Sequence, residues 1–405
     1  MNYTDVVKPA TYADDKGLHG LLTHMRANDP VAWIDTPTHD PFYALTKHAD
    51  IIEVSRRSDT FINAPRAILV PRPKPGEEPP EMQARVLIAI DGEEHKALRG
   101  LSQDWFLPES LKRFEPAVRE IARQSVDHML SLGEEFDFVK DVAVWYPLKV
   151  IMKILGVPDD KGDMLLTMTQ QMFGAADPDV TRDLTDEERV QLFTDFYAYC
   201  AQVCADRHQH PEDDLASVIA NGRINGEPLS QMDTLGYFLI VASAGHDTTS
   251  SSTAGALHAL LERPDQMKKL RDNPEFIPTM VEESIRWVTP VKHFMRTATE
   301  DYQLRDKTVE AGQSVMLLYP SANRDEDVFE SPFEFRVDRR PNRHLAFGHG
   351  AHHCLGNLLA KMEMRILYEE LFSRVRDMEL NGEPKLIQSV FVSGLKTLPV
   401  RMKPA

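Results

Sequence analysis

The sequence predicts a mainly α-helical fold with a minor β region. Apolar residues recur with helical period over most of residues 94–263, whereas short β-like segments occur before residue 47 and after residue 290. No regular alternation of strand and helix is present, so a doubly wound parallel sheet is not expected. The chain contains neither an internal repeat nor a Gly/Ser linker, and we expect residues 1–405 to form a single domain.

The predicted elements begin with an extended pair at residues 31–34 and 42–46. A Pro-rich stretch between Asn63 and Gln83 follows. It cannot be regular helix or central strand, because proline lacks the backbone N–H that both need. Helical patterns then cover residues 94–103, 109–131, 140–155, 160–173, 186–206 and 212–221.

A single long helix is predicted for residues 230–263. Ser230 with Asp233 resembles a capping box at its start, and Pro264 forces its end. The elements expected after it are a helix at 278–288, short strands at 291–297, 302–304 and 314–318, a helix at 355–371, and strands with a turn at 386–402.

The composition excludes several classes of protein. A net charge of −17 disfavours nonspecific nucleic-acid binding. No stretch approaches the roughly 18 consecutive apolar residues of a membrane helix. The segment Met1–Lys16 is polar and acidic, unlike a secretory signal, so a cytoplasmic location is expected. Three cysteines exclude a disulfide framework, and Cys200 and Cys204, which share one helix face, are best explained by packing.

Cys354 lies in the run FGHGAHHCLG at residues 347–356. Gly348 and Gly350 allow a tight turn with positive φ. Because a helical stretch follows, the cysteine is expected near a helix N-terminus, where the dipole and free N–H groups favour a thiolate. Cys354 is therefore a candidate metal ligand. The alternatives are an inert buried cysteine and a zinc site shared with the three histidines of the run, although no second zinc knuckle is visible.

The cysteine run resembles the haem-binding loop of the cytochrome P450 family, whose pattern is Phe-Gly-x-Gly-x-His/Arg-x-Cys-x-Gly. This resemblance implies that Cys354 is the axial iron ligand of a haem b, in a loop that includes Phe347 and Gly356. It also implies the P450 fold, a triangular helical prism with the haem between a long central helix and the cysteine loop. Within the family, the sequence looks most like the bacterial α-terpineol hydroxylase branch.

A second motif, AGHDTT at residues 244–249, lies inside the predicted long helix. Helix interiors disfavour glycine, aspartate and paired threonines, and Thr248 can bond back to the Ala244 carbonyl and bend the helix. The motif resembles the family's oxygen-activation motif. The resemblance implies that Gly245 contacts the cofactor, Thr248 orders hydrogen bonds to bound O2 and Asp247 relays protons. The alternative explanation of the run is a Ser/Thr-rich packed helix.

Two sets of charged residues also match family positions. Glu283 and Arg286, in a Glu-x-x-Arg pattern, and Arg339 match a structural trio that holds the haem side of the fold. Haem carries two propionates, and their burial needs charged donors. The positions that match propionate contacts are His95, Arg99, Arg296 and His352.

The resemblance implies a haem-thiolate monooxygenase that uses O2 to hydroxylate a small hydrophobic substrate, such as a monoterpenoid or a substituted aromatic hydrocarbon. By family position, the substrate pocket is expected at Val241, Ala244, Val291, Phe294, Val390 and Phe391. Two alternatives remain open. One is a P450 that acts on a larger lipid, such as a steroid or fatty acid, and the other is a haem protein that binds a ligand without turnover.

Electrons are expected from a [2Fe–2S] ferredoxin and its reductase. Residues 336–365 hold six basic and two acidic residues, a local net charge of +4 around Cys354 in an acidic chain. Because complementary charge steers encounter, an acidic ferredoxin is expected to dock on this segment. Its basic residues are Arg336, Arg339, Arg340, Arg343, Lys361 and Arg365.

Overall fold

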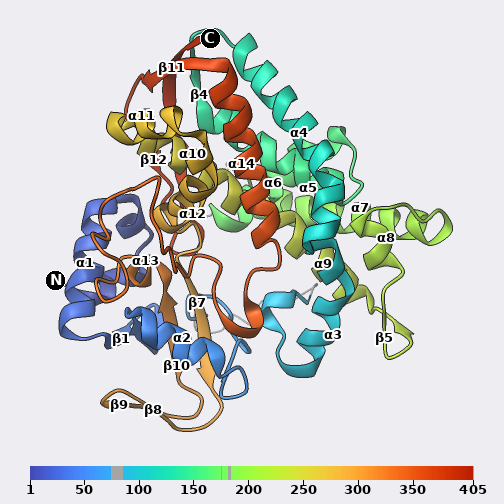
Figure 1. Cartoon of the computed structure of the whole chain (residues 1–405). Helices are drawn as coiled ribbons and strands as arrows, with labels where there is room; N and C mark the ends of the chain where they lie inside the picture. The colour runs from blue at the N-terminus through green and yellow to red at the C-terminus, as the bar shows by residue number, and fades with distance from the viewer. Residues whose placement is uncertain (74–84, 175, 181–183, 405) are drawn as a thin grey trace.

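Helices gather on one side of the molecule and a β-sheet on the other (Figure 1). The computed structural model describes residues 1–73, 85–174, 176–180 and 184–404. In Figure 1 the blue N-terminal segment and the orange strands lie at the lower left, and the green helices lie at the right. The predicted class, mainly α with a minor β region, is confirmed.

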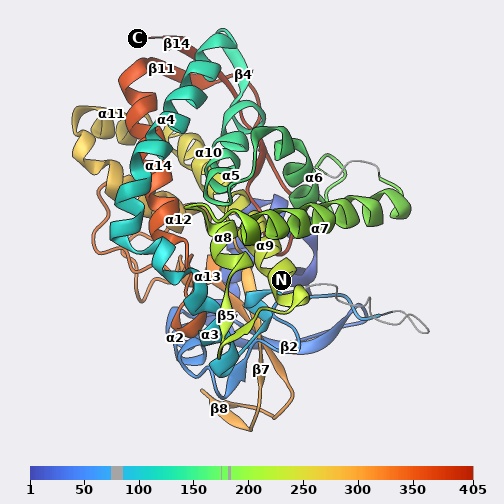
Figure 2. The ribbon, with the colours of Figure 1, turned by 90° about the vertical axis from the view of Figure 1, so that its right-hand side faces the viewer.

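The helical side carries most of the chain. The α-helices are α1 (Asp15–Asn28), α2 (His48–Arg56), α3 (Gly92–Gln103), α4 (Pro108–Ser131), α5 (Trp145–Ile154), α6 (Gly162–Phe173), α7 (Asp186–Gln209), α8 (Leu215–Ala220), α9 (Gln231–Ala244), α10 (Asp247–Leu261), α11 (Pro264–Asp272), α12 (Ile277–Val288), α13 (Tyr319–Ala322) and α14 (Asn357–Arg374). A π-helical turn, η5 (Val139–Ala143), precedes α5. Figure 2 shows α7 lying across α8 and α9.

The strands form one five-stranded sheet and smaller pairings. They are β1 (Val31–Thr36), β2 (His39–Leu45), β3 (Phe61–Ile62), β4 (Glu135–Asp137), β5 (Arg223–Ile224), β6 (Glu227–Pro228), β7 (His293–Ala298), β8 (Tyr302–Leu304), β9 (Lys307–Val309), β10 (Ser314–Leu318), β11 (Val375–Leu380), β12 (Lys385–Leu386), β13 (Leu395–Thr397) and β14 (Pro399–Pro404). The five-stranded sheet has the order β1-β2-β10-β7-β3. In it, β10 runs parallel to β2 and antiparallel to β7.

The long helix predicted at 230–263 is in fact two helices. α9 ends at Ala244 and α10 begins at Asp247, so the regular helix is interrupted at Gly245 and His246. A side chain at position 245 could not fit, because its Cβ would lie 2.2 Å from Ile151 Cγ1 and 2.8 Å from the Val241 carbonyl oxygen. The prediction of one continuous helix was therefore wrong, and the break falls within the AGHDTT motif at residues 244–249.

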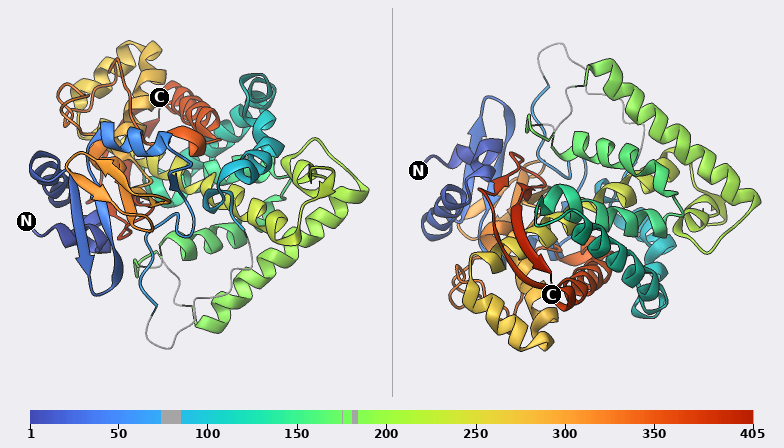
Figure 3. Two further views of the ribbon diagram at one scale, coloured as in Figure 1. Left: turned by 90° about the horizontal axis from the view of Figure 1, so that it is seen from below. Right: turned by 90° about the horizontal axis from the view of Figure 1, so that it is seen from above.

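The sequence reading also missed α1 and α2. α1 buries an apolar stripe of Leu18, Leu21, Leu22 and Met25, with the Asp14 side chain accepting from the Gly17 N–H as the N-cap. Both views in Figure 3 place the N-terminal segment at an edge of the molecule, away from α7.

Part of the Pro-rich stretch predicted between residues 63 and 83 lies outside the described residues. The described part, 63–73, has no helix or strand.

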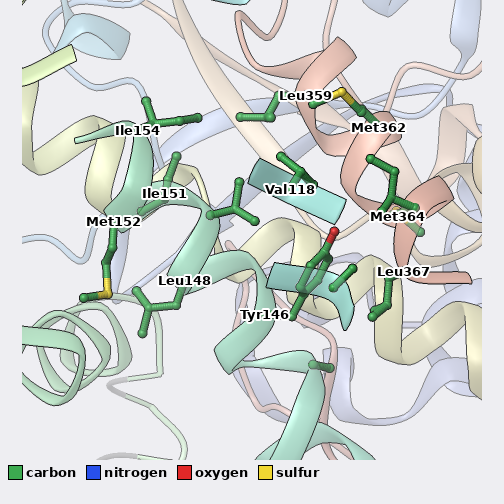
Figure 4. Close-up of a cluster of buried hydrophobic side chains, with 14 of the residues drawn as sticks. Val118, Tyr146, Leu148, Ile151, Met152, Ile154, Leu359, Met362, Met364 and Leu367 are labelled. Atoms are coloured by element: carbon green, nitrogen blue, oxygen red, sulfur yellow. The ribbon is translucent and has the colours of Figure 1, made fainter. Parts of the chain in front are cut away.

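The largest core joins α4, α5 and α14 (Figure 4). Val118 of α4, Ile151 of α5 and Leu367 of α14 are each at most 2% exposed. The Tyr146 hydroxyl donates to the Glu363 carbonyl at 3.0 Å and ties α5 to α14. This packing fixes α14, and with it the chain just after Cys354. In the described part of the chain, no helix is both long and apolar enough to cross a membrane.

Candidate active site

The loop before α14 folds tightly because of its two glycines. Gly348 has φ +70° and Gly350 has φ +76°. A Cβ on Gly350 would lie 2.0 Å from the Ser55 carbonyl oxygen of α2, so only glycine allows this approach. The Cys354 N–H donates to the Phe347 carbonyl at 2.9 Å and closes the loop. The positive φ values expected for the two glycines are confirmed.

Cys354 lines a cavity, which we call the main cavity. Burial raises the pKa of its thiol, while the Gly356 N–H and the positive charges of Arg99 and Lys361 lower it to a smaller extent. The Gly356 N–H at the start of α14 thus acts in the direction expected of a helix N-terminus, but burial outweighs it. A coordinated metal ion reverses this balance, since its charge removes the proton of a coordinating thiol.

The break between α9 and α10 lines the main cavity together with the cysteine loop. Predicted site residues from both segments line the cavity: Val241, Ala244, Gly245, Thr248, Phe347, Cys354 and Gly356. Leu87, Ile88, Tyr237 and Ile240 also line the wall, together with Ile151 and Glu363, which sequence reasoning missed. These lie on elements distant in sequence, and no motif marks them.

Thr248 and Asp247 face different cavities. The Thr248 hydroxyl donates to the Ala244 carbonyl at 3.2 Å, as predicted, and Thr248 lines the main cavity. Asp247 instead lines a second cavity, which is bounded by α6, η5, α10 and the 385–397 segment. Its Oδ1 lies 3.3 Å from His246 Nε2, and its Oδ2 has no hydrogen-bond partner among the described residues. Burial raises the pKa of Asp247, although His246 and Thr169 oppose the shift.

Four basic side chains gather beside the main cavity. The His95 and His352 rings lie 4.0 Å apart, and burial lowers the pKa of both. For His352, the neighbouring His95 and Arg296 contribute, and its pKa falls to about 3. Arg99 donates to the His353 carbonyl at 2.7 Å, and Arg296, 4% exposed, donates to the Met295 carbonyl at 2.7 Å.

Of these four side chains, His352 has its Nε2 3.5 Å from Asp91 Oδ1, but the two arginines have no carboxylate partner among the described residues. Among the described residues, neither Arg99 nor Arg296 forms an ion pair within 4.0 Å. The only hydrogen-bond acceptors they have there are the two carbonyls above. A buried cation without an opposite charge is unfavourable, so the site suits an anionic ligand. The propionates of a haem, with Cys354 as a sulfur ligand, fit this donor set.

Comparisons with known proteins agree with this geometry. The profile of the family "Cytochrome P450" matches residues 71–399. The chain belongs to the cytochrome P450 family. It is 39% identical to cytochrome P450-terp of Pseudomonas sp over 99% of this chain and 97% of that protein. It is 31% identical to linalool 8-monooxygenase of Pseudomonas putida over the whole of both chains.

Solved structures show the same likeness. The crystal structure of CYP108D1 from Novosphingobium aromaticivorans superposes with a TM-score of 0.91 at 41% identity, covering 100% of this chain and 98% of that one. The chain is thus a cytochrome P450 monooxygenase, and membership of the family implies the use of haem and O2. The zinc alternative has no support, because no group of three or more His, Cys, Asp or Glu residues in the described ranges could hold a metal ion.

In this P450, Glu283 is the centre of a buried ionic cluster. It accepts from Arg286 Nε and Nη2 at 2.7 and 2.8 Å, and from Arg339 Nε at 2.9 and 3.0 Å. Both arginines also donate to carbonyls of the segment 330–334 that leads toward the cysteine loop. Burial raises the pKa of Glu283, but the hydrogen bonds and charge of Arg286 outweigh it and leave the pKa lowered.

The predicted substrate residues of this P450 fall into two groups. Val291 and Phe294 line the main cavity with Val241 and Ala244. Val390 and Phe391 are not among the described residues that line it, because Phe391 packs behind Phe294 with ring centroids 5.5 Å apart. Arg296 likewise lies outside the lining, since it is buried in β7.

The basic segment around Cys354 is less basic in the folded P450 than in the sequence. Arg339 is buried on Glu283, Lys361 lies 2.8 Å from Glu282, and Arg365 lies 3.1 Å from Glu115. The local sum of +4 ignored these acidic partners because they come from α12 and α4. Arg340 and Arg343 remain exposed. The +4 prediction therefore overstated the surface charge.

Proposed function

We propose that this P450 binds haem b and hydroxylates a small hydrophobic substrate, a monoterpenoid or a substituted aromatic hydrocarbon, with electrons from a [2Fe–2S] ferredoxin. The observation that carries the proposal is the main cavity itself. Cys354 and Thr248 both line it, and the rest of its lining is contributed mostly by apolar residues. Bound haem supplies the redox chemistry that activates O2.

The protein's own residues bind, orient and deliver protons. Cys354 would supply the sulfur ligand, Arg99 and Arg296 would neutralise the propionates, and the His95 and His352 rings would donate hydrogen bonds to them. Thr248 presents a hydroxyl to the main cavity at the helix break, where it orders hydrogen bonds near the reacting oxygen. Asp247, the residue before Thr248, carries protons toward it from the second cavity.

The substrate class follows from the wall of the main cavity. Val241, Ala244, Val291 and Phe294 offer hydrocarbon surface, which binds an apolar molecule through desolvation. A relative named for linalool, a small terpenoid alcohol, supports this class. A larger lipid remains the second candidate, because Val291 of this wall pairs with Val392, which lines the second cavity.

The proposed activity is tested with haem-loaded protein, a surrogate ferredoxin and its reductase, and α-terpineol as the probe. We expect one hydroxylated product per O2 consumed. Thr248→Ala should keep consuming O2 while product falls, because ordered proton delivery is lost; Ser252→Ala, which removes a hydroxyl that bonds to the Thr248 carbonyl, is the matched control. Equal coupling in Thr248→Ala and wild type would contradict the role given to Thr248.

The surface proposed to bind ferredoxin is the exposed surface around the start of α14. Leu358, 39% exposed in the first turn of α14, offers an apolar contact, and the exposed Arg340 and Arg343 add positive charge. Reduction rates should fall with rising salt and in Arg343→Glu. Arg189→Glu on α7, an equally large charge change elsewhere, is the control. If the rate at which ferredoxin reduces this P450 changes neither with salt nor in Arg343→Glu, ferredoxin docks on another surface.

A further inference from the structure

His293 joins two loops that are distant in sequence. It lies at the start of β7 and is fully buried. Its Nε2 accepts the Leu69 N–H at 3.0 Å, and its Nδ1 donates to the Val390 carbonyl at 2.8 Å. The first bond holds the described part of the Pro-rich stretch, and the second holds the turn at 390–392.

The two partners fix the state of the ring. A backbone N–H can only donate, so Nε2 must be unprotonated, and a carbonyl can only accept, so Nδ1 must carry the proton. Burial lowers the pKa of His293 to about 4, which the bond to Val390 only partly opposes. The ring is therefore neutral at pH 7 and makes both bonds at once.

The turn that His293 holds forms part of a wall between the two cavities. Val291 lines the main cavity and pairs as a β-bridge with Val392, which lines the second cavity. The Phe391 ring lies 5.5 Å from Phe294, which lines the main cavity, and 5.9 Å from Phe173, which lines the second.

Backbone bonds support the same wall. The Lys292 N–H donates to the Phe391 carbonyl at 2.8 Å, and the Ser393 N–H donates to the Pro290 carbonyl at 3.0 Å. The His293 ring also packs against the Phe391 ring, with centroids 5.6 Å apart. Of the described side chains, His293 is the one that bonds both to Val390, next to this wall, and to Leu69.

We propose that His293 is a positioning residue for substrate selection: it holds the 390–392 turn against β7, so that Phe391 and Val392 close the main cavity off from the second cavity. Small molecules are then retained over the cofactor and larger ones are excluded. This inference rests on the proposed function, because it places the substrate in the main cavity. When the clamp is lost, the two cavities join and the size limit relaxes.

The test uses two probes that bind haem iron through an imidazole nitrogen but differ in bulk, 4-phenylimidazole and clotrimazole. Spectral titration of haem-loaded full-length protein gives a dissociation constant for each. In His293→Leu, which removes both bonds, and in Phe391→Ala, which removes the ring, we expect the ratio of the constants to shift about tenfold or more toward clotrimazole. His39→Leu, a buried histidine of β2 that lines neither cavity, should keep the wild-type ratio.

A second measurement separates positioning from general damage. Amide hydrogen exchange at Leu69 should speed up in His293→Leu and stay unchanged in Phe391→Ala, because only the first removes its acceptor. Wild-type ratios in both His293→Leu and Phe391→Ala would overturn the proposal. The carbon monoxide spectrum of the reduced wild type is also recorded. If this spectrum lacks the signature of thiolate ligation, the proposed function is wrong. If the spectrum shows that signature but the ratio of dissociation constants stays at the wild-type value in both variants, only the proposed role of His293 is wrong.

Discussion

Loss of the Glu283 charge should destabilise this P450 more than loss of any comparable surface charge. Glu283 accepts bonds from Arg286, Arg339 and Asn342 and from the Arg336 N–H, and it is fully buried. Glu283→Gln keeps the shape but leaves two buried guanidiniums facing an amide. Removing one partner of a buried ion pair costs about 3–5 kcal/mol, because the remaining charge is uncompensated.

The assay is urea unfolding at pH 7, followed by far-UV circular dichroism. The matched control is Glu120→Gln in α4, whose carboxylate pairs with Arg123 at the same i,i+3 spacing but on the surface. We expect Glu283→Gln to lose several kcal/mol of unfolding free energy and Glu120→Gln to show no measurable change. Equal midpoints for the two variants would refute the reasoning.

The pH dependence gives a second check on the same variant. The folded-state pKa of Glu283 is lowered from its ordinary value of 4.5. An acid with a lowered pKa contributes stability that is fully present above its unfolded pKa and is lost as the pH falls through the folded pKa. The difference between wild type and Glu283→Gln should therefore shrink on acidification below pH 4.5, and a difference that grows there would contradict the assignment.

Three further outcomes are expected. Burial lowers the pKa of Lys292 from 10.5 to about 8. Wild type should therefore gain roughly 3 kcal/mol of unfolding free energy relative to Lys292→Met as the pH rises from 8 to 10.5. Urea unfolding measures this difference, and a difference that does not change with pH would contradict the lowered pKa. Gly350→Ala should weaken haem retention, measured by transfer to apomyoglobin, whereas Gly226→Ala, also at positive φ but with open space around it, should not. Arg296→Met should bind a haem dimethyl ester as well as wild type does but haem itself more weakly, and equal losses for both would argue against a propionate contact.

The sequence by itself determined the features that are local. The loop around Cys354 requires glycines at fixed positions because the turn has positive φ at Gly348 and Gly350. A few adjacent residues of the sequence are enough to recognise this requirement. The bond from Thr248 to the Ala244 carbonyl follows from helical spacing alone. For the same reason the helix and strand classes were predictable over most of the chain, although α1 and α2, with no motif to mark them, were missed.

Only the tertiary structure decided what depends on partners distant in the chain. The close approach of Ile151 of α5 leaves no room for a side chain at Gly245, and only the fold shows that Asp247 lines the second cavity. The charge of the surface near Cys354 depends on Glu282 and Glu115, and the clamp at His293 depends on Leu69 and Val390. Spacing along the chain records which residues share a helix face, but it does not record which loops the fold brings within 3 Å of a buried ring.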